Sequence, residues 1–166
     1  MLEEQNNQHV RPSWDEYFMK LAQMVGERGT CDRGRAGSVA VKDKRIMATG
    51  YVGSPPGMPH CDEAGHIIHE VINDDGTVSK HCVRTIHSEQ NIICQAAKYG
   101  ISLDGCTIYT KMEPCYVCAR MLVAVGIKRV VCQKRYHGAK LTRELFEKAG
   151  IKLDVLEDEL ETYKDM

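Results

Sequence analysis

The chain has 166 residues, a length that suits a single domain over residues 1–166 with a sizeable core. Lysine and arginine total 22 against 23 acidic residues, so the formal net charge of −1 argues against a broad basic surface for nucleic acid. No apolar run reaches membrane-spanning length and residues 1–10 are polar, so we expect a cytoplasmic protein without membrane partners.

The first elements predicted along the chain are a helix and a hairpin. Ser13 and Glu16 form a capping box for a helix that runs to about Glu27. Residues 38–41 and 45–51 read as two strands joined by a tight turn. The helix should pack on the sheet through apolar residues at helical spacing, namely Tyr17, Phe18, Leu21, Met24 and Val25.

Two less regular segments follow. Glycine and proline between residues 50 and 57 predict a loop near a strand end, where loops commonly shape a substrate mouth. Residues 58–84 are expected to be irregular, and a long loop inside a compact domain needs something to hold it. A metal ion could do so, because this segment contains His60, Cys61, His66, His69, His81 and Cys82.

The second half of the chain alternates helices and strands, which predicts an α/β fold: a three-layer α/β/α sandwich around a mixed sheet. An acidic tail, residues 157–166, is expected to lie on the surface. The predicted elements are a helix from about His87 to before Gly100, a strand 107–112, a helix from the cysteines after Pro114 to about Val125, a strand 129–133, a helix 141–148 and a strand 151–156.

The residues that could carry chemistry lie in two short segments, His87-Ser88-Glu89 and residues 114–118. Cys115 and Cys118 are three apart, so one helical turn lets both sulfurs bind one metal ion, with His87 as third ligand. A fourth position stays open for water, which Glu89 can reach as a proton carrier without ligating. A lone C-x-x-C is also typical of redox pairs and structural zinc, but H-x-E followed by P-C-x-x-C is the signature of zinc nucleobase deaminases. Cysteines that serve as metal ligands fit a reducing cytosol, so we expect no disulfides.

Further blocks accompany this motif over most of the chain: Trp14-x-x-Tyr17-Phe18-Met19, Thr30-Cys31-x-Arg33, Ala48-Thr49-Gly50-Tyr51, His60-Cys61 and His81-Cys82-Val83-Arg84-Thr85-Ile86-His87-x-Glu89. Together they resemble the deoxycytidylate (dCMP) deaminase branch of the cytidine deaminase-like superfamily. The resemblance implies a five-stranded sheet flanked by helices, a zinc cofactor, and hydrolysis of dCMP to dUMP and ammonia in supply of thymidylate synthesis. Glu89 would pass a proton from water to N3 of the pyrimidine and then to the leaving amine.

The resemblance also implies partners and a second metal site. Many relatives are hexamers activated by dCTP and inhibited by dTTP, so a homo-oligomer with these effectors is the corresponding expectation. A second, structural zinc would be held by Cys31, Cys61 and Cys82, with His66, His69 or His81 as the remaining ligand. The alternative is a buried cysteine and solvent-facing histidines without metal. Core positions are expected for the other three cysteines, Cys94, Cys106 and Cys132.

Several positions bear on the substrate. Val52 stands where relatives usually carry an asparagine suited to the sugar hydroxyl, a hydrogen bond that an aliphatic side chain cannot make. Glu113, before Pro114-Cys115, resembles deaminases of tRNA or purines, and Ser88 replaces a usual alanine. Tyr136 either contacts the nucleotide or belongs to the core, and Lys98 meets either a phosphate or only water.

Three functions therefore stay open at the level of the sequence. The leading one is zinc-dependent deamination of the small-molecule nucleotide dCMP. The second is deamination of another nucleotide or of a free base, suggested by Val52 and Glu113. The third is a zinc-binding sensor that has lost turnover, against which the intact Glu89 argues.

Overall fold

The computed structural model describes residues 9–72 and 76–161 and contains a sheet of five strands in the order β2-β1-β5-β6-β7. β1 pairs antiparallel with β2 and β5, whereas β6 is parallel to both β5 and β7, so the sheet is mixed as predicted. The strands are β1 (Gly37–Lys42), β2 (Arg45–Tyr51), β5 (Thr107–Met112), β6 (Arg129–Lys134) and β7 (Lys152–Val155).

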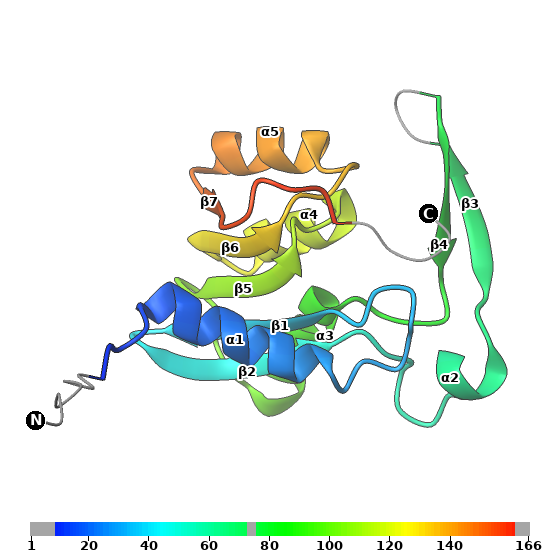
Figure 1. Ribbon diagram of the computed structural model, residues 1–166, viewed down its shortest axis with the longest axis horizontal. Coiled ribbons are helices and arrows are strands. Elements are labelled where there is room, and N and C mark those ends of the chain that lie inside the picture. The colour runs from blue at the N-terminus through cyan, green and yellow to red at the C-terminus, as the bar shows by residue number, and fades with distance from the viewer. Residues whose placement is uncertain (1–8, 73–75, 162–166) are drawn as a thin grey trace, which may run out of the picture.

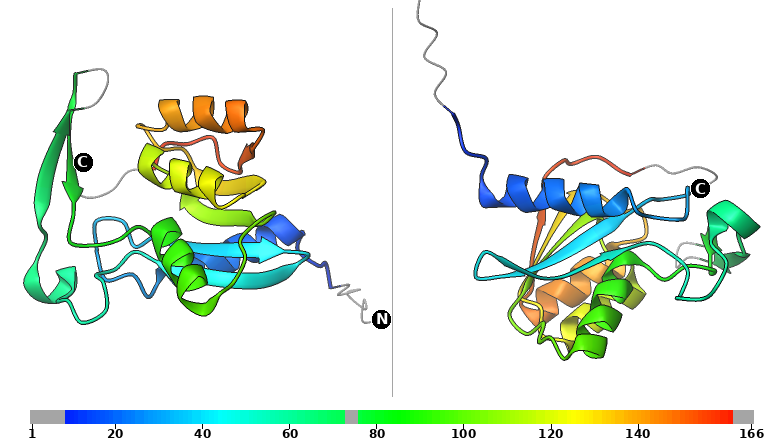
Figure 2. Two further views of the ribbon diagram at one scale, coloured as in Figure 1. Left: turned by 180° about the vertical axis from the view of Figure 1, so that it is seen from behind. Right: turned by 90° about the horizontal axis from the view of Figure 1, so that it is seen from below.

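Helices cover both faces of this sheet. α1 (Trp14–Gly26) lies alone on one face, and α3 (Ser88–Tyr99), α4 (Tyr116–Ala124) and α5 (Lys140–Ala149) lie on the other, as Figures 1 and 2 show. The predicted three-layer α/β/α fold is therefore confirmed. None of the helices within the two described ranges has the length and apolar character needed to cross a bilayer.

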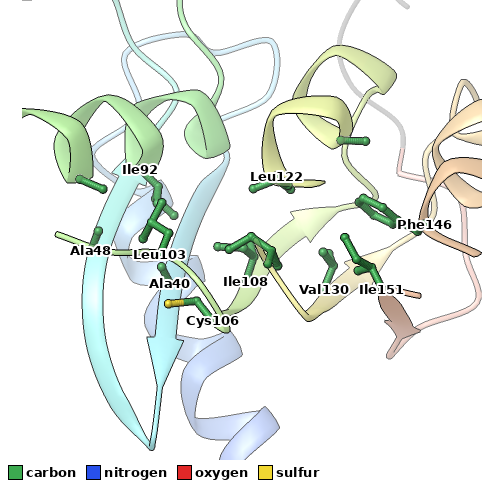
Figure 3. Packing of buried hydrophobic residues seen from close by; sticks show 13 residues of the cluster. Ala40, Ala48, Ile92, Leu103, Cys106, Ile108, Leu122, Val130, Phe146 and Ile151 are labelled. Carbon is green, nitrogen blue, oxygen red and sulfur yellow. The ribbon is translucent and has the colours of Figure 1, made fainter. Parts of the chain in front are cut away.

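The two sides of the sheet bury two clusters of apolar side chains. The larger one joins α3, α4 and α5 to the strands through Ile92, Ile108, Leu122, Val130 and Phe146, all at most 1% exposed (Figure 3). A smaller one lies beneath α1 and includes Phe18, Val39 and Val131. The central strands are apolar on both faces because each face is covered by helices.

The buried stripe of α1 differs from the prediction. Phe18, Met19 and Ala22 are buried, whereas the predicted Tyr17 and Met24 are exposed. The reason is the close approach of the helix end to β1: a Cβ added at Gly37 would lie only 2.2 Å from the Gly26 nitrogen. Backbone packs on backbone there, which turns the Ala22–Gly26 side of the helix toward the sheet.

The prediction of an irregular segment over residues 58–84 is wrong. It contains a short helix, α2 (Cys61–Ala64), and an antiparallel hairpin of β3 (Ile68–Ile72) and β4 (Val78–Cys82). Figure 1 shows this hairpin standing apart from the five-stranded sheet. All five residues of β3 are exposed, so the alternation of buried and exposed residues that usually identifies a strand is missing.

Two smaller expectations also need correction. Cys94 is exposed on α3 rather than in the core, unlike Cys106 and Cys132, which are buried. The acidic tail is not wholly on the surface, because Glu161 is buried and its carboxylate lies 2.7 Å from Lys111 Nζ. Residues 162–166 of that predicted tail lie outside the described residues.

Candidate active site

The starts of two helices bring three potential metal ligands together. His87 is the N-cap of α3, Cys115 is the N-cap of α4, and Cys118 lies in the first turn of α4. His87 Nδ1 lies 3.5 Å from Cys115 Sγ and 3.3 Å from Cys118 Sγ. One ligand atom from each residue lies within 4.8 Å of the others, as a single metal ion requires. We call these three residues the His87 cluster.

Without a metal ion, the His87 cluster holds one thiolate between two protonated groups. Hydrogen bonds with Cys118 and His87 lower the pKa of Cys115 to about 4, and the hydrogen bond with Cys115 raises the pKa of His87 to about 9. The neighbouring Cys115 and burial raise the pKa of Cys118 far above its usual value. Two adjacent buried thiolates repel each other, so a divalent cation between them is what lets both ionise.

Glu89 lies in the first turn of α3 and is buried beside this cluster, where burial raises the pKa of its carboxyl group. The Ser88 hydroxyl donates to Glu89 Oε2 at 3.0 Å. Behind it, Ser88 Oγ lies 2.7 Å from Ser38 Oγ, which in turn donates to Thr110 Oγ1 at 2.9 Å. A buried chain of hydroxyl groups therefore runs from the central strands to the carboxylate. Nothing but the unusual serine at position 88 could have indicated this chain in advance.

A second buried carboxylate, Glu113, fixes the segment just before Cys115. Arg143 donates to its two oxygens at 2.7 and 2.6 Å, and the Tyr136 amide donates at 3.0 Å. Burial alone would raise the pKa of Glu113, but these hydrogen bonds hold it below its usual value. Because the Glu113 carboxylate is engaged within the protein, its role is structural, and it does not indicate which nucleobase is the substrate.

The cavity next to the His87 cluster contains most of the predicted site residues. Glu89, Cys115, Val52 and Tyr136 line it together with His87. Tyr136 is buried as well, which agrees with a core position, and its contact with the nucleotide stays a prediction. Lys98 is not among the lining residues; it lies in the last turn of α3, with its Nζ 5.7 Å from the centre of the Tyr99 ring.

The structure also gathers the residues predicted for the second metal. Ligand atoms of Cys31, Cys61, His66 and Cys82, which we call the Cys31 cluster, lie within 4.8 Å of one another. Of the three candidate histidines, His66 belongs to the cluster, whereas His69 does not and His81 lines the cavity instead. These four residues come from the loop after α1, from α2, and from both ends of the β3–β4 hairpin.

Contacts around the Cys31 cluster orient its donor atoms. His66 Nδ1 lies 3.7 Å from Cys31 Sγ, and Nε2 lies 3.0 Å from Asp32 Oδ1. A proton on Nε2 that is held by this carboxylate leaves Nδ1 as a free donor for a metal. Burial raises the pKa of Cys61 to about 12, whereas hydrogen bonds from the Arg84 amide and His66 overcome burial and lower that of Cys82 to about 7.

Comparison with known proteins agrees with this geometry. Residues 12–134 match the family described as the cytidine and deoxycytidylate deaminase zinc-binding region. ComE operon protein 2 of Bacillus subtilis (strain 168) is 38% identical over 89% of this chain and 73% of that protein. The deoxycytidylate deaminase of Mycobacterium phage D29 is 36% identical over 75% of this chain and 97% of that protein.

A solved structure extends the likeness to three dimensions. The crystal structure of dCMP deaminase from the cyanophage S-TIM5, in complex with dCMP and dUMP, has a TM-score of 0.70 and 26% identity, covering 89% of this chain and 99% of that chain. The family match, the relatives and the fold together show that the chain belongs to the cytidine and deoxycytidylate deaminase family of hydrolases.

Proposed function

We propose that this protein hydrolyses dCMP to dUMP and ammonia. The observation that carries the proposal is the buried Glu89 carboxylate beside the His87 cluster in one cavity. The likeness to the phage D29 deoxycytidylate deaminase and to the cyanophage enzyme that binds dCMP and dUMP supports the choice of substrate. Thymidylate synthesis is the pathway that we propose it supplies, because dUMP is the precursor implied by the family.

We propose that His87, Cys115 and Cys118 hold the catalytic zinc, since one nitrogen and two sulfurs are the donors that tetrahedral zinc prefers. Bound zinc supplies a Lewis acid that lowers the pKa of water to roughly 7. Glu89 would accept a proton from the attacking water as its oxygen adds to C4, deliver that proton to N3 of the pyrimidine ring, and later give a proton to the amine as the C4–N bond breaks. Burial raises the pKa of the Glu89 carboxyl group, which favours its taking up a proton during the reaction.

A second zinc at the Cys31 cluster is part of the same proposal. Three sulfurs and one nitrogen within 4.8 Å of one another supply the four donors that tetrahedral zinc needs, and zinc sites with four protein ligands are structural rather than catalytic. Elemental analysis of the purified protein should give two zinc ions per chain, whereas one per chain would refute the second site.

The substrate is tested by incubating the purified zinc protein with dCMP, CMP, deoxycytidine, cytosine and the corresponding adenine and guanine compounds, and measuring ammonia. We expect the highest kcat/KM for dCMP. Turnover of dCMP no faster than that of deoxycytidine or free bases would reject the proposal.

One observation favours the second candidate, deamination of another nucleotide or a free base. Val52 lines the cavity with an aliphatic side chain that offers no hydrogen bond to a sugar. The same substrate panel distinguishes the two candidate functions, because the second one requires a compound other than dCMP to be the best substrate.

Regulation, assembly and location are proposed from the family resemblance and from the thiols. Repeating the panel with dCTP and with dTTP tests activation and inhibition, and sedimentation tests the hexamer. None of the eight cysteines, all within the described residues, forms a disulfide, which suits the reducing cytoplasm that we propose as its location.

A further inference from the structure

Hydroxyl groups interrupt the apolar packing between the sheet and the start of α3. Ser38 of β1 and Thr110 of β5 are cross-strand neighbours, and their side chains meet the Ser88 hydroxyl beneath that helix. The next cross-strand pair on the same face, Ala40 and Ile108, belongs to the larger apolar cluster. The three hydroxyl groups therefore occupy positions at the edge of the core that apolar side chains could fill.

These hydroxyl groups are poorly explained by stability alone. All three residues are at most 2% exposed, and their oxygens are bonded to one another. A set of apolar groups of the same shape would be about as stable, because buried hydrogen bonds only replace hydrogen bonds with water. What the hydroxyl groups add is a defined donor at the end of the chain, where Ser88 donates to Glu89 Oε2 at 3.0 Å.

The position of Ser88 is fixed by its backbone as well as by its hydroxyl group. A Cβ added at Gly50 of β2 would lie 2.3 Å from the Ser88 carbonyl oxygen, so only glycine allows this close approach of helix and strand. One turn further along α3, Asn91 Nδ2 donates to the Tyr51 carbonyl oxygen at 2.9 Å. Ser88 is therefore a rigid support, and a group that it holds is held in one place.

The chain also suits a partner that changes its protonation. A hydroxyl group has one hydrogen, which rotates, and two lone pairs, so it can donate or accept. Ser38 Oγ lies 2.7 Å from Ser88 Oγ and 2.9 Å from Thr110 Oγ1, and its hydrogen can turn to either neighbour. Ser88 can therefore stay bonded to Oε2 whether the Glu89 carboxyl group is ionised or carries a proton.

We propose that Ser88 is a positioning residue for the reaction: it holds the Glu89 carboxyl group through Oε2, so that Oε1 is the oxygen that exchanges protons with water and substrate. The inference rests on the proposed function and deepens it. The terminal bond of a glutamate side chain has broad torsional preferences, whereas proton transfer needs the reacting atoms at hydrogen-bonding distance in one orientation. The hydrogen bond from Ser88 removes this freedom.

The test compares wild type with Ser88→Ala on the best substrate of the panel, so that it does not depend on that substrate being dCMP. The kcat should fall about 10- to 100-fold, as expected for a misdirected proton carrier. KM and zinc content should stay within about twofold of wild type. Alanine is the residue that relatives usually carry here, so the variant should fold and bind zinc.

Two further variants make the result specific to the hydroxyl group. Ser88→Thr keeps the hydroxyl group and should keep kcat within about threefold of wild type. Ser102→Ala makes the same change as Ser88→Ala at an exposed position outside the cavity, and it should alter neither kcat nor KM.

A merely structural role of Ser88 gives a different result. Ser88→Ala would then lose zinc or bind the reaction product more weakly, and kcat per bound zinc would stay at the wild-type value. That result, or a Ser88→Thr protein no more active than Ser88→Ala at equal zinc content, would overturn the inference while leaving the proposed deamination intact. If the wild-type protein deaminates no compound of the panel, the proposed function itself fails and this inference with it.

Discussion

At the scale of single residues, Glu89 bears the proposed proton transfers. Glu89→Gln keeps the shape of the side chain but removes its ability to exchange a proton, so ammonia release from dCMP should fall about 100- to 10,000-fold. Because Glu89 is proposed to carry protons rather than to ligate, zinc should stay bound, as measured by elemental analysis of the same preparation. Unchanged ammonia release would remove Glu89 from the mechanism.

A matched control for this substitution is available on α5. Glu144→Gln makes the same chemical change at an exposed position outside the cavity. It should leave both turnover and zinc content at wild-type values, and a loss of turnover there would mean that the Glu89 result reflects protein quality rather than chemistry.

The chain of buried hydroxyl groups behind Glu89 should contribute to the free energy of unfolding. Ser38→Ala removes the middle member, so the hydroxyls of Ser88 and Thr110 stay buried with one hydrogen bond fewer each. The free energy of unfolding should fall by about 1–3 kcal/mol in urea denaturation. Ser102→Ala, at an exposed position, should change it by less than about 0.5 kcal/mol. Equal effects of the two substitutions would contradict the role given to the buried chain.

Some residues of the site could be predicted from the sequence and others could not. Metal-ligand chemistry restricts both residue type and spacing, so His87, Cys115 and Cys118 were predictable before their distances were known, whereas the Cys31 cluster was implied by the family resemblance. Ser38 and Thr110 were not, because a serine or threonine within a strand has no pattern that indicates which hydroxyl it will meet.

At the scale of elements, α1 is joined to the sheet by an ion pair as well as by its apolar stripe. Asp15 accepts two hydrogen bonds from Arg129 of β6, both 2.8 Å, and one from the Tyr109 hydroxyl of β5 at 2.7 Å. Asp15→Asn should lower the free energy of unfolding at pH 7 by about 1 kcal/mol, a modest value because both partners are about a third exposed.

The pKa of Asp15 determines how the contribution of this ion pair to the free energy of unfolding depends on pH. Hydrogen bonds from Arg129, and then from Tyr109, hold the pKa of Asp15 below its usual value in the folded protein. The unfolded chain therefore binds the proton more readily, so the stabilisation is present above about pH 4 and is lost as the pH falls through the folded pKa. Urea denaturation of wild type and Asp15→Asn at pH 7 and pH 3 should give curves that converge at the lower pH. Glu147→Gln on the surface of α5 should show no such convergence.

Elements with a buried side were predicted well, and the hairpin was not. β5 has the predicted bounds, Thr107–Met112, because its run of apolar and β-branched residues is covered on both faces. β3 and β4 lack such a run of buried residues, and the potential metal ligands around them suggested a loop. The Asp75-Gly76 pair between Val71-Ile72 and Thr77-Val78 is the signal that could have identified a hairpin, since this dipeptide favours tight turns between strands.

At the scale of the whole molecule, the structure divides into a packed sandwich and a hairpin that has little core of its own. Every residue of β3 is exposed, so the hairpin is attached by few contacts apart from the Cys31 cluster. One of these contacts is the hydrogen bond from Arg33 to the Lys80 carbonyl. The sandwich, by contrast, holds both buried apolar clusters. Loss of the proposed second metal should therefore release the hairpin without unfolding the rest.

Cys61→Ser tests this division. The substitution removes one sulfur from the Cys31 cluster, so zinc content should fall from two ions to one per chain, and amide hydrogen exchange should accelerate in residues 61–72 and 78–84. Exchange in β1, β5 and β6 should stay slow, because their burial does not depend on the cluster. Cys94→Ser, which alters an exposed thiol on α3, should change neither zinc content nor exchange. If exchange accelerated in the central strands as well, the cluster would be a support of the whole domain, and the hairpin could not be treated as a separately anchored part.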